Sequence, residues 1–143
     1  MDIKSKHSSW DGEDLLIENV MGEIEISTNH NDIYLKEVTG PMAIKTVYGS
    51  IEAQFKFLSQ KGSVSLYSVY EHVDITLPEQ SACKVNLKTM HGHIFSDLDI
   101  NLDKEISKDS ESQGDNIMGN LNGGGVDLTI SATYDNIYLR KAN

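Results

Sequence analysis

The amino-acid sequence predicts an all-β protein, folded as a short single-stranded parallel β-helix (β-solenoid) with a right-handed coil. A turn followed by a strand of alternating apolar residues recurs along the chain, with glycine in the turn at Gly22, Gly40, Gly49, Gly62, Gly92 and Gly125. Gly22 and Gly40 are 18 residues apart and Gly40 and Gly62 are 22 apart, which indicates about 20 residues per coil. A repeat of this length fits two or three short strands, because each coil must return to the same lateral position.

The first half of the chain contains an entry segment and then the most regular repeats. Residues 1–14 precede the repeats, and we expect Trp10 in this segment to cover the open end of the first coil. After Gly22, Gly40, Gly49 and Gly62, the first apolar strand residue stands two positions beyond the glycine. Apolar residues then occupy every second position, so one face of each strand is buried and the other faces solvent.

The second half repeats this alternation and adds one irregular segment. The strands expected here are 73–77, 83–88 and 126–130. Residues 31–36 (Asn-Asp-Ile-Tyr-Leu-Lys) return almost unchanged as residues 135–140 (Asp-Asn-Ile-Tyr-Leu-Arg), so we expect residues 1–143 to form one solenoid domain. Residues 101–125 are acidic and rich in Gly, Asn and Ser, and we expect them to leave the solenoid wall as a loop.

The composition disfavours two classes of partner. The chain has 22 acidic and 12 basic residues and a formal net charge of -10, which disfavours nucleic acid because phosphate binding needs clustered Lys and Arg. No apolar run approaches the length of a membrane-spanning helix, and residues 1–6 lack the apolar stretch of a signal peptide. We expect either a cytosolic chain or one whose leader or anchor lies outside this sequence.

Two segments raise the question of reactivity or ion binding. The single cysteine, Cys83, shares the alternation of Val85 and Leu87, which predicts a buried core residue rather than a reactive thiol. Asp109 and Glu111 stand at offsets similar to those of a calcium loop, but Asn120 occupies the position of the bidentate Glu. A solvated acidic loop is therefore the simpler interpretation.

Three histidines are the candidates for a metal site, although we expect neither a metal nor a cofactor. His91 and His93 flank Gly92 and would point to the same side of an extended strand. His72 stands in the equivalent turn 21 residues earlier, so sequential stacking of coils would bring a third imidazole near. Exposed turn histidines are the simpler interpretation of this pattern.

The sequence does not favour an enzyme. A β-helix polysaccharide enzyme needs paired carboxylates and a cation beside its substrate, and the chain has acidic residues in abundance, including Asp97, Asp99 and Asp103. Its single arginine, Arg140, stands three residues from the end of the chain, and no serine-nucleophile, phosphate-loop or zinc-protease motif is present. We therefore expect a noncatalytic protein.

The order of three segments resembles a known family. Glu71–Pro78, Val85–Ile94 and Gly125–Leu139 follow one another as in the bacterial "putative adhesin" or toast-rack domains, and the similarity covers nearly the whole chain. The resemblance implies a β-helix-like fold and a place at the bacterial cell envelope, in some cases beside the membrane modules of stress-response systems. It supplies no catalytic residues. Glu71 and Asp135 replace the glycine expected in their turns.

A stack of parallel coils presents flat faces that suit binding or spacing better than catalysis. Tyr34 and Tyr138 should point outward, because Ile33, Leu35 and the equivalent Ile137 and Leu139 should point inward. These two tyrosines are the candidate binding residues for a protein or glycan at the cell envelope, although an outward tyrosine ladder also stabilises neighbouring strands.

We expect an adhesin-like interaction or structural module. A regulatory or sensory domain of an envelope stress system is one alternative, and a small carbohydrate-active β-helix enzyme is another. Exposed coil ends also make edge-to-edge or end-to-end self-association a possibility to test.

Overall fold

The computed structural model describes residues 3–4, 14–98, 100–104 and 116–142, and these residues form fourteen strands and no helix. The eight-stranded sheet contains, in spatial order, β1 (Ile3–Lys4), β3 (Ile24–Thr28), β5 (Met42–Thr46), β7 (Val64–Ser68), β13 (Val126–Ala132), β9 (Cys83–Thr89), β12 (Asn116–Leu121) and β11 (Asn101–Lys104). The six-stranded sheet contains β10 (Ile94–Ser96), β14 (Ile137–Lys141), β8 (Val73–Leu77), β6 (Ile51–Phe55), β4 (Ile33–Val38) and β2 (Leu15–Glu18). The all-β, solenoid-like prediction is confirmed, and the right hand of the coil stays a prediction.

Each coil consists of one strand in each sheet, and the predicted spacing holds in the first coils. Ile24 of β3 pairs with Met42 of β5, 18 residues later, and Met42 pairs with Val64 of β7, 22 residues later. The six-stranded sheet follows the same steps, since Ile33 pairs with Ile51 and Ile51 with Val73. These pairings are parallel, as a continuous coil requires.

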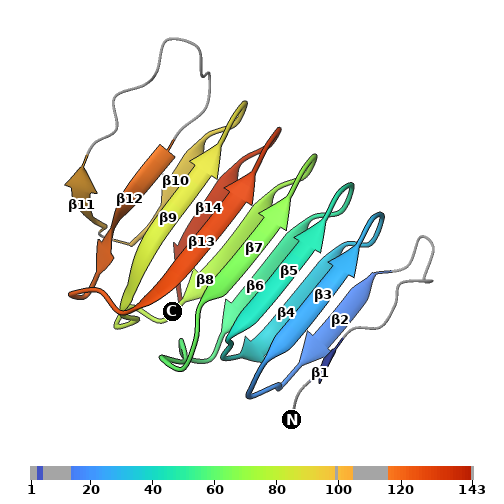
Figure 1. Ribbon diagram of the computed structural model, residues 1–143, viewed down its shortest axis with the longest axis horizontal. Coiled ribbons are helices and arrows are strands. Elements are labelled where there is room, and N and C mark those ends of the chain that lie inside the picture. The colour runs from blue at the N-terminus through green and yellow to red at the C-terminus, as the bar shows by residue number, and fades with distance from the viewer. Residues whose placement is uncertain (1–2, 5–13, 99, 105–115, 143) are drawn as a thin grey trace.

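The coils do not stack in chain order. β13 lies between β7 and β9, and β14 lies between β8 and β10, so the last coil of the chain fills a position that the chain skipped after β8 (Figure 1). β13 pairs with β7 through five residues and with β9 through seven. The 21-residue step from Glu71 to Gly92 therefore does not join neighbouring coils, contrary to the expected sequential stacking.

The expected loop over residues 101–125 is only partly a loop. β11 and β12 pair antiparallel with each other, and β12 pairs antiparallel with β9, so both strands extend the eight-stranded sheet beyond the last parallel coil. The entry segment's Trp10 and the calcium-like positions Asp109 and Glu111 lie outside the described residues.

Side-chain amides hold the return from β12 to β13 in place. Asn122 Nδ2 donates to the carbonyl oxygens of Glu79 (2.9 Å) and Ser81 (2.7 Å). Gln60 Nε2 donates to Ala82 O at 2.8 Å, and Gln60 Oε1 accepts a hydrogen bond from Val126 N at 3.1 Å. These bonds tie the inserted coil to turns on both of its sides.

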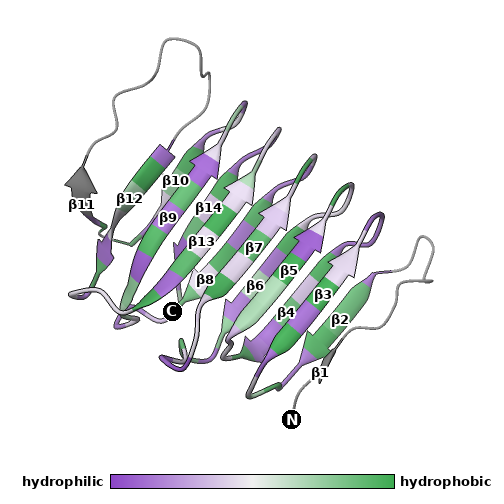
Figure 2. Cartoon of the chain, in the orientation of Figure 1, coloured by the Kyte–Doolittle hydropathy of each residue, from purple (hydrophilic) through white to green (hydrophobic). Residues whose placement is uncertain are grey.

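The core lies between the two sheets and follows the predicted alternation. Along the strands, apolar and polar residues alternate, as the banding in Figure 2 shows. The fully buried positions are mostly Ile, Leu and Val, for example Ile24, Ile75 and Leu128. Burial of each such side chain contributes about 1.5–3 kcal/mol relative to exposure, so one continuous apolar column stabilises all the coils.

Side-chain hydroxyl groups form hydrogen bonds to backbone carbonyls in the turns that follow strands of the eight-stranded sheet. Thr46, Ser68 and Thr89 are buried at equivalent ends of β5, β7 and β9. Ser68 Oγ donates to Gly49 O and Thr89 Oγ1 donates to Gly92 O, each at 2.8 Å. The buried hydroxyls of Ser68 and Thr89 are thereby paired with turn carbonyls, as buried polar groups generally are.

Glycine is required in two of these turns because a neighbouring backbone approaches closely. A Cβ atom at Gly49 would lie 1.9 Å from Asn31 O, and one at Gly92 would lie 2.0 Å from Asp135 O. Neither glycine has a positive φ, and neither do Glu71 and Asp135 at the equivalent positions. The turns at Glu71 and Asp135 need no positive φ, and close approach of a neighbouring coil requires glycine at Gly49 and Gly92.

Cys83 should react slowly with thiol reagents in the folded protein. Its side chain is fully buried, as expected from the sequence, and burial raises the pKa of the thiol to about 11. At pH 8 the thiolate fraction is then about 100-fold below that of a thiol with its ordinary pKa, and reactivity rises only as the pH approaches 11. Labelling with a disulfide reagent at pH 8 should be at least about 100-fold faster in urea-unfolded protein, and similar rates would contradict the buried position.

Candidate functional site

The outer face of the six-stranded sheet carries a row of outward side chains, one from each strand, three of which are aromatic. The register places them side by side in the order Phe95, Tyr138, Asp74, Glu52, Tyr34 and Leu16. At about 4.8 Å between strands, the row is roughly 24 Å long. Its ends are aromatic or apolar, with Phe95 50% and Leu16 57% exposed, and its centre is acidic.

Tyr34 and Tyr138 both point outward, as the alternation predicts. Their neighbours along the strands, Ile33, Leu35 and Leu139, are at most 1% exposed, whereas both tyrosines are partly exposed. The two tyrosines are three strands apart, with Glu52 and Asp74 between them. They lie on one face without touching each other, and their role in binding stays a prediction.

Tyr34 lies in an acidic part of this face. Burial raises the pKa of its phenol, and the nearby carboxylates of Asp32, Asp14 and Glu52 raise it further. In the described part of the chain, no aromatic ring stacks on Tyr34, whose side chain is partly exposed.

Tyr138 is more constrained by its neighbours. Its ring stacks on Phe95 with 5.4 Å between centroids, and the Arg140 guanidinium lies 5.2 Å from the ring centroid. Its hydroxyl accepts a hydrogen bond from Asn136 Nδ2 at 3.0 Å, and Arg140 Nε donates to both carboxylate oxygens of Asp74. Tyr138 therefore stabilises the packing of side chains across neighbouring strands, while Phe95 presents the more exposed ring.

A second group of aromatic rings, the turn ladder, runs along one side of the solenoid. Its members are His30, Tyr48, Tyr70, Tyr134 and His91, one from each of the five described turns that lead from the eight-stranded to the six-stranded sheet. Adjacent centroids are 5.0 Å apart and the planes differ by 2–19°. These turns line up in Figure 1. Because neighbouring rings cover each other's faces, the ladder offers ring edges and hydroxyls to solvent.

The three candidate histidines do not come together. The inserted coil separates His72 in the β7–β8 turn from His91 and His93 in the β9–β10 turn. His91 stacks on Tyr134, whereas His93 makes an edge contact with Phe95. The expected approach of a third imidazole therefore does not occur, because a different coil occupies the intervening position.

His72 instead lies beside two carboxylates. One ligand atom each from Glu71, His72 and Asp135 lies within 4.8 Å of the others. His72 Nε2 is also 3.6 Å from Glu52 Oε2. Neighbouring turns, β7–β8 and β13–β14, supply the three residues, and this arrangement depends on the inserted coil.

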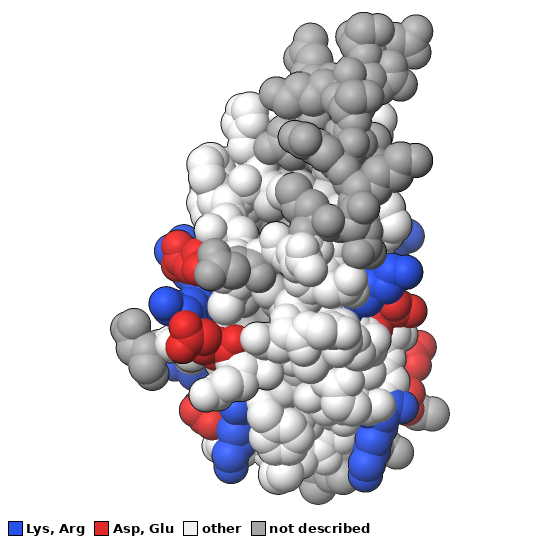
Figure 3. All heavy atoms as spheres, turned by 90° about the vertical axis from the view of Figure 1, so that its left-hand side faces the viewer, with Lys and Arg blue, Asp and Glu red and all other residues white. Residues whose placement is uncertain are grey.

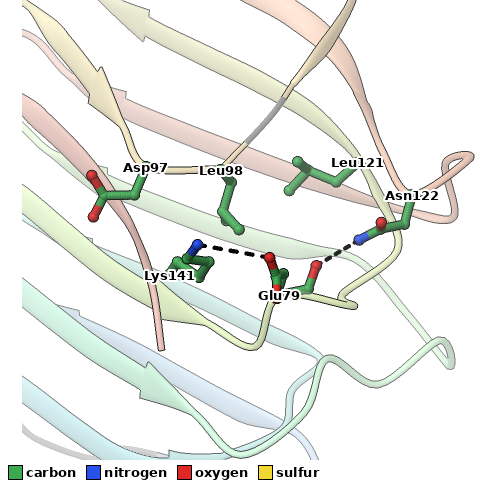
Figure 4. Close-up of a pocket in the computed structure, with 6 residues that line it drawn as sticks. All are labelled: Glu79, Asp97, Leu98, Leu121, Asn122 and Lys141. Atoms are coloured by element: carbon green, nitrogen blue, oxygen red, sulfur yellow. Dashed lines mark hydrogen bonds and ion pairs between the residues drawn. The ribbon is translucent and has the colours of Figure 1, made fainter. Parts of the chain in front are cut away.

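A small cavity lies at the opposite side of the stack, near the end of β14. It has a volume of about 150 Å³ and is lined by Glu79, Asp97, Leu98, Leu121, Asn122 and Lys141. Lys141 Nζ pairs with Glu79 Oε2 at 3.7 Å, while the Asp97 carboxylate points away from that pair (Figure 4). The two carboxylates therefore do not converge on a common reacting atom.

The end of the stack near β11 presents mixed charge. In the view of Figure 3, Lys and Arg lie next to Asp and Glu along both sides, with uncharged side chains between them.

No helix of the described residues is long and apolar enough to cross a membrane.

Sequence reasoning missed several residues that the structure brings into these groups. Phe95 stands in a strand of only three residues, Ile94–Ser96, which is too short to show the alternation. It was therefore not recognised as outward-facing, although it is the register partner of Tyr138. The turn ladder had a signal, because each member stands two residues after the last residue of its strand, as Tyr48 does after Thr46. No local feature of the sequence predicts that Glu71 lies beside Asp135, because their proximity results from insertion of the last coil between two earlier coils.

Loss of a central ring should destabilise the turn ladder more than loss of its hydroxyl. Tyr70 stacks on both Tyr48 and Tyr134, so Tyr70→Ala should cost about 1–3 kcal/mol from two ring pairs alone. Tyr70→Phe keeps the ring and should cost less than about 0.5 kcal/mol. Urea unfolding measures both values, and equal effects of the two substitutions would contradict a stabilising ladder.

The comparisons with known proteins agree on the fold. A comparison with curated protein sequences found no significant match. A solved structure described as "a putative cell adhesion protein" from Clostridium sporogenes is similar, with a TM-score of 0.60, 11% identity and 86% of this chain covered. The match spans 57% of that longer chain, so it is a likeness of fold to part of that protein.

A family model matches residues 8–140, nearly the whole chain. It describes the Toastrack domain, DUF4097, a designation that names a fold and assigns no catalytic activity. The order of strands and turns that suggested a toast-rack domain is thereby confirmed, and the chain belongs to the Toastrack DUF4097 family.

Proposed function

We propose that this chain is a noncatalytic binding module of the cell envelope and that it binds an extended glycan through the outer face of its six-stranded sheet. The observation that carries the proposal is the row from Leu16 to Phe95, which places one outward side chain on each of six neighbouring strands, three of them aromatic. A flat row roughly 24 Å long suits an extended polymer better than a compact small molecule.

The opposite face has few comparable anchors. Its outward rows are Glu25, Ala43, Ser65, Thr129 and Asn86, which has no aromatic residue, and Ser27, Lys45, Tyr67, Ser131 and Lys88, whose one aromatic ring has Lys45 Nζ 5.8 Å from its centroid. Binding surfaces depend on a few large side chains, aromatic ones above all. The six-stranded sheet is therefore the favoured recognition face.

The chemistry of the row favours a neutral glycan. Tyr34 and Phe95 offer ring surfaces to the apolar faces of sugars, and Glu52 and Gln54 between them offer polar groups to sugar hydroxyls. The carboxylates around Tyr34 and the net charge of -10 disfavour an acidic polymer.

Two further observations support the proposal, one for a noncatalytic protein and one for a place at the cell envelope. The cavity at Glu79 and Lys141 pairs its lysine with one carboxylate, and its second carboxylate, Asp97, points elsewhere. The similar structure carries a description of cell adhesion, which supports an envelope setting for this chain. A protein partner on the same face is the alternative outcome of the experiment below.

A glycan array should give reproducible binding to one class of neutral glycan. The purified domain is screened in calcium and separately in EDTA, and the Tyr34→Ala and Phe95→Ala variants should each reduce binding at least tenfold. The loss follows because each variant removes a ring that the sugar contacts.

Tyr67→Ala is the matched control, since Tyr67 is an outward tyrosine on the other sheet. It should leave glycan binding unchanged. Silence on the array, or binding that Tyr67→Ala weakens as much as Tyr34→Ala, would contradict the proposal. A pull-down from membrane extracts with the same three variants would then test for a protein partner.

A further inference from the structure

Three side chains in two neighbouring turns combine the donor types of a transition-metal site. Glu71 and His72 come from the β7–β8 turn and Asp135 from the β13–β14 turn, with their ligand atoms within 4.8 Å of one another. Glu71 is exposed and the other two are partly exposed, so an ion could enter from solvent. Small rotations of side chains would bring the three atoms to the shorter separations that a bound ion imposes.

The turn positions themselves distinguish this pair of turns from the rest. The equivalent positions in the line of turns are Asn31, Gly49, Glu71, Asp135 and Gly92, in spatial order. Only Glu71 and Asp135 are acidic, and the inserted coil makes these two turns immediate neighbours although they are 64 residues apart in the chain. Sequential stacking would have placed Gly92 beside Glu71 and left a single carboxylate there.

The local charge also favours a cation. In the described part of the chain, no Lys or Arg forms an ion pair with Glu71 or Asp135, whereas Asp74 and Glu79 are paired with Arg140 and Lys141. Two facing carboxylates repel each other, and a bound cation would relieve that repulsion. The third nearby carboxylate, Glu52, lies 3.6 Å from His72 Nε2.

We propose that Glu71, His72 and Asp135 form a binding site for a divalent transition-metal ion of the Zn²⁺ type. The imidazole nitrogen favours such an ion over Ca²⁺ or Mg²⁺, which prefer oxygen ligands alone. Zinc sites with three protein ligands keep a fourth position for water or another molecule, and the exposure of Glu71 leaves room for one. Glu52 Oε2 lies 3.6 Å from His72 Nε2, so a small rotation of the Glu52 side chain would let it accept a hydrogen bond from that nitrogen and orient the ring, with Nδ1 left to bind the ion.

The site adjoins the row of the glycan-binding proposal through Glu52, and of the three histidines considered from the sequence it uses only His72. His91 is held in the turn ladder against Tyr134, and His93 contacts Phe95, so neither ring faces His72.

Calorimetric titration of chelator-treated protein with Zn²⁺ alone tests the site. Saturable binding of one ion is expected, and Glu71→Gln and Asp135→Asn should each weaken binding at least tenfold. Asp127→Asn is the charge-matched control, because Asp127 lies on the outer face at the other end of β13. It should leave the affinity within about twofold of the wild type.

A second measurement uses the unaltered chain and does not depend on variants that fold. In ¹⁵N-labelled wild-type protein, Zn²⁺ should shift the ring nitrogens of His72 and leave those of His91 unshifted. No saturable binding, or shifts confined to His91 and His93, would overturn the proposal. Equal loss of affinity in Asp127→Asn and Asp135→Asn would also overturn it, because the effect would then be one of overall charge.

Discussion

The parallel hydrogen-bonded register between coils is the constraint on which the rest of this structure depends. Every inward residue must meet its equivalent in the next coil, so the apolar column is continuous only if each coil position is filled. After β8 the chain leaves one position empty, and β13 and β14 later fill it with parallel partners on both sides. Without that coil, β7, β8, β9 and β10 would each expose an unpaired edge.

The same constraint positions the surface groups. Because turns stack in register, one ring per turn produces the turn ladder, and one outward residue per strand produces the row from Leu16 to Phe95. Insertion of the last coil places Tyr134 between Tyr70 and His91, and it places Asp135 beside Glu71. The surface groups of this scaffold therefore lie along lines of equivalent positions.

Much of the fold could be predicted from local sequence, because alternation and glycine spacing are local properties. They gave the strands around Ile24, Val64 and Val73, the buried Cys83 and the outward Tyr34 and Tyr138. The order of the coils could not be predicted in this way, since β13 satisfies the same alternation in any parallel position. Residues 101–104 and 116–121 were also mistaken for loop, because their polar composition hid two strands that pair on a sheet edge. The candidate metal ligands depend on coil order, and for that reason the sequence grouped His72 with His91 and His93 rather than with Glu71 and Asp135.

The central claim is that the last coil lies between two earlier ones, and ring-to-ring nuclear Overhauser effects test it most directly. Tyr134 has its ring 5.0 Å, centroid to centroid, from both Tyr70 and His91. The inserted order predicts cross-peaks from Tyr134 to both of these rings and none between Tyr70 and His91. A direct cross-peak between Tyr70 and His91, with Tyr134 contacting only one of them, would show sequential stacking and contradict the account.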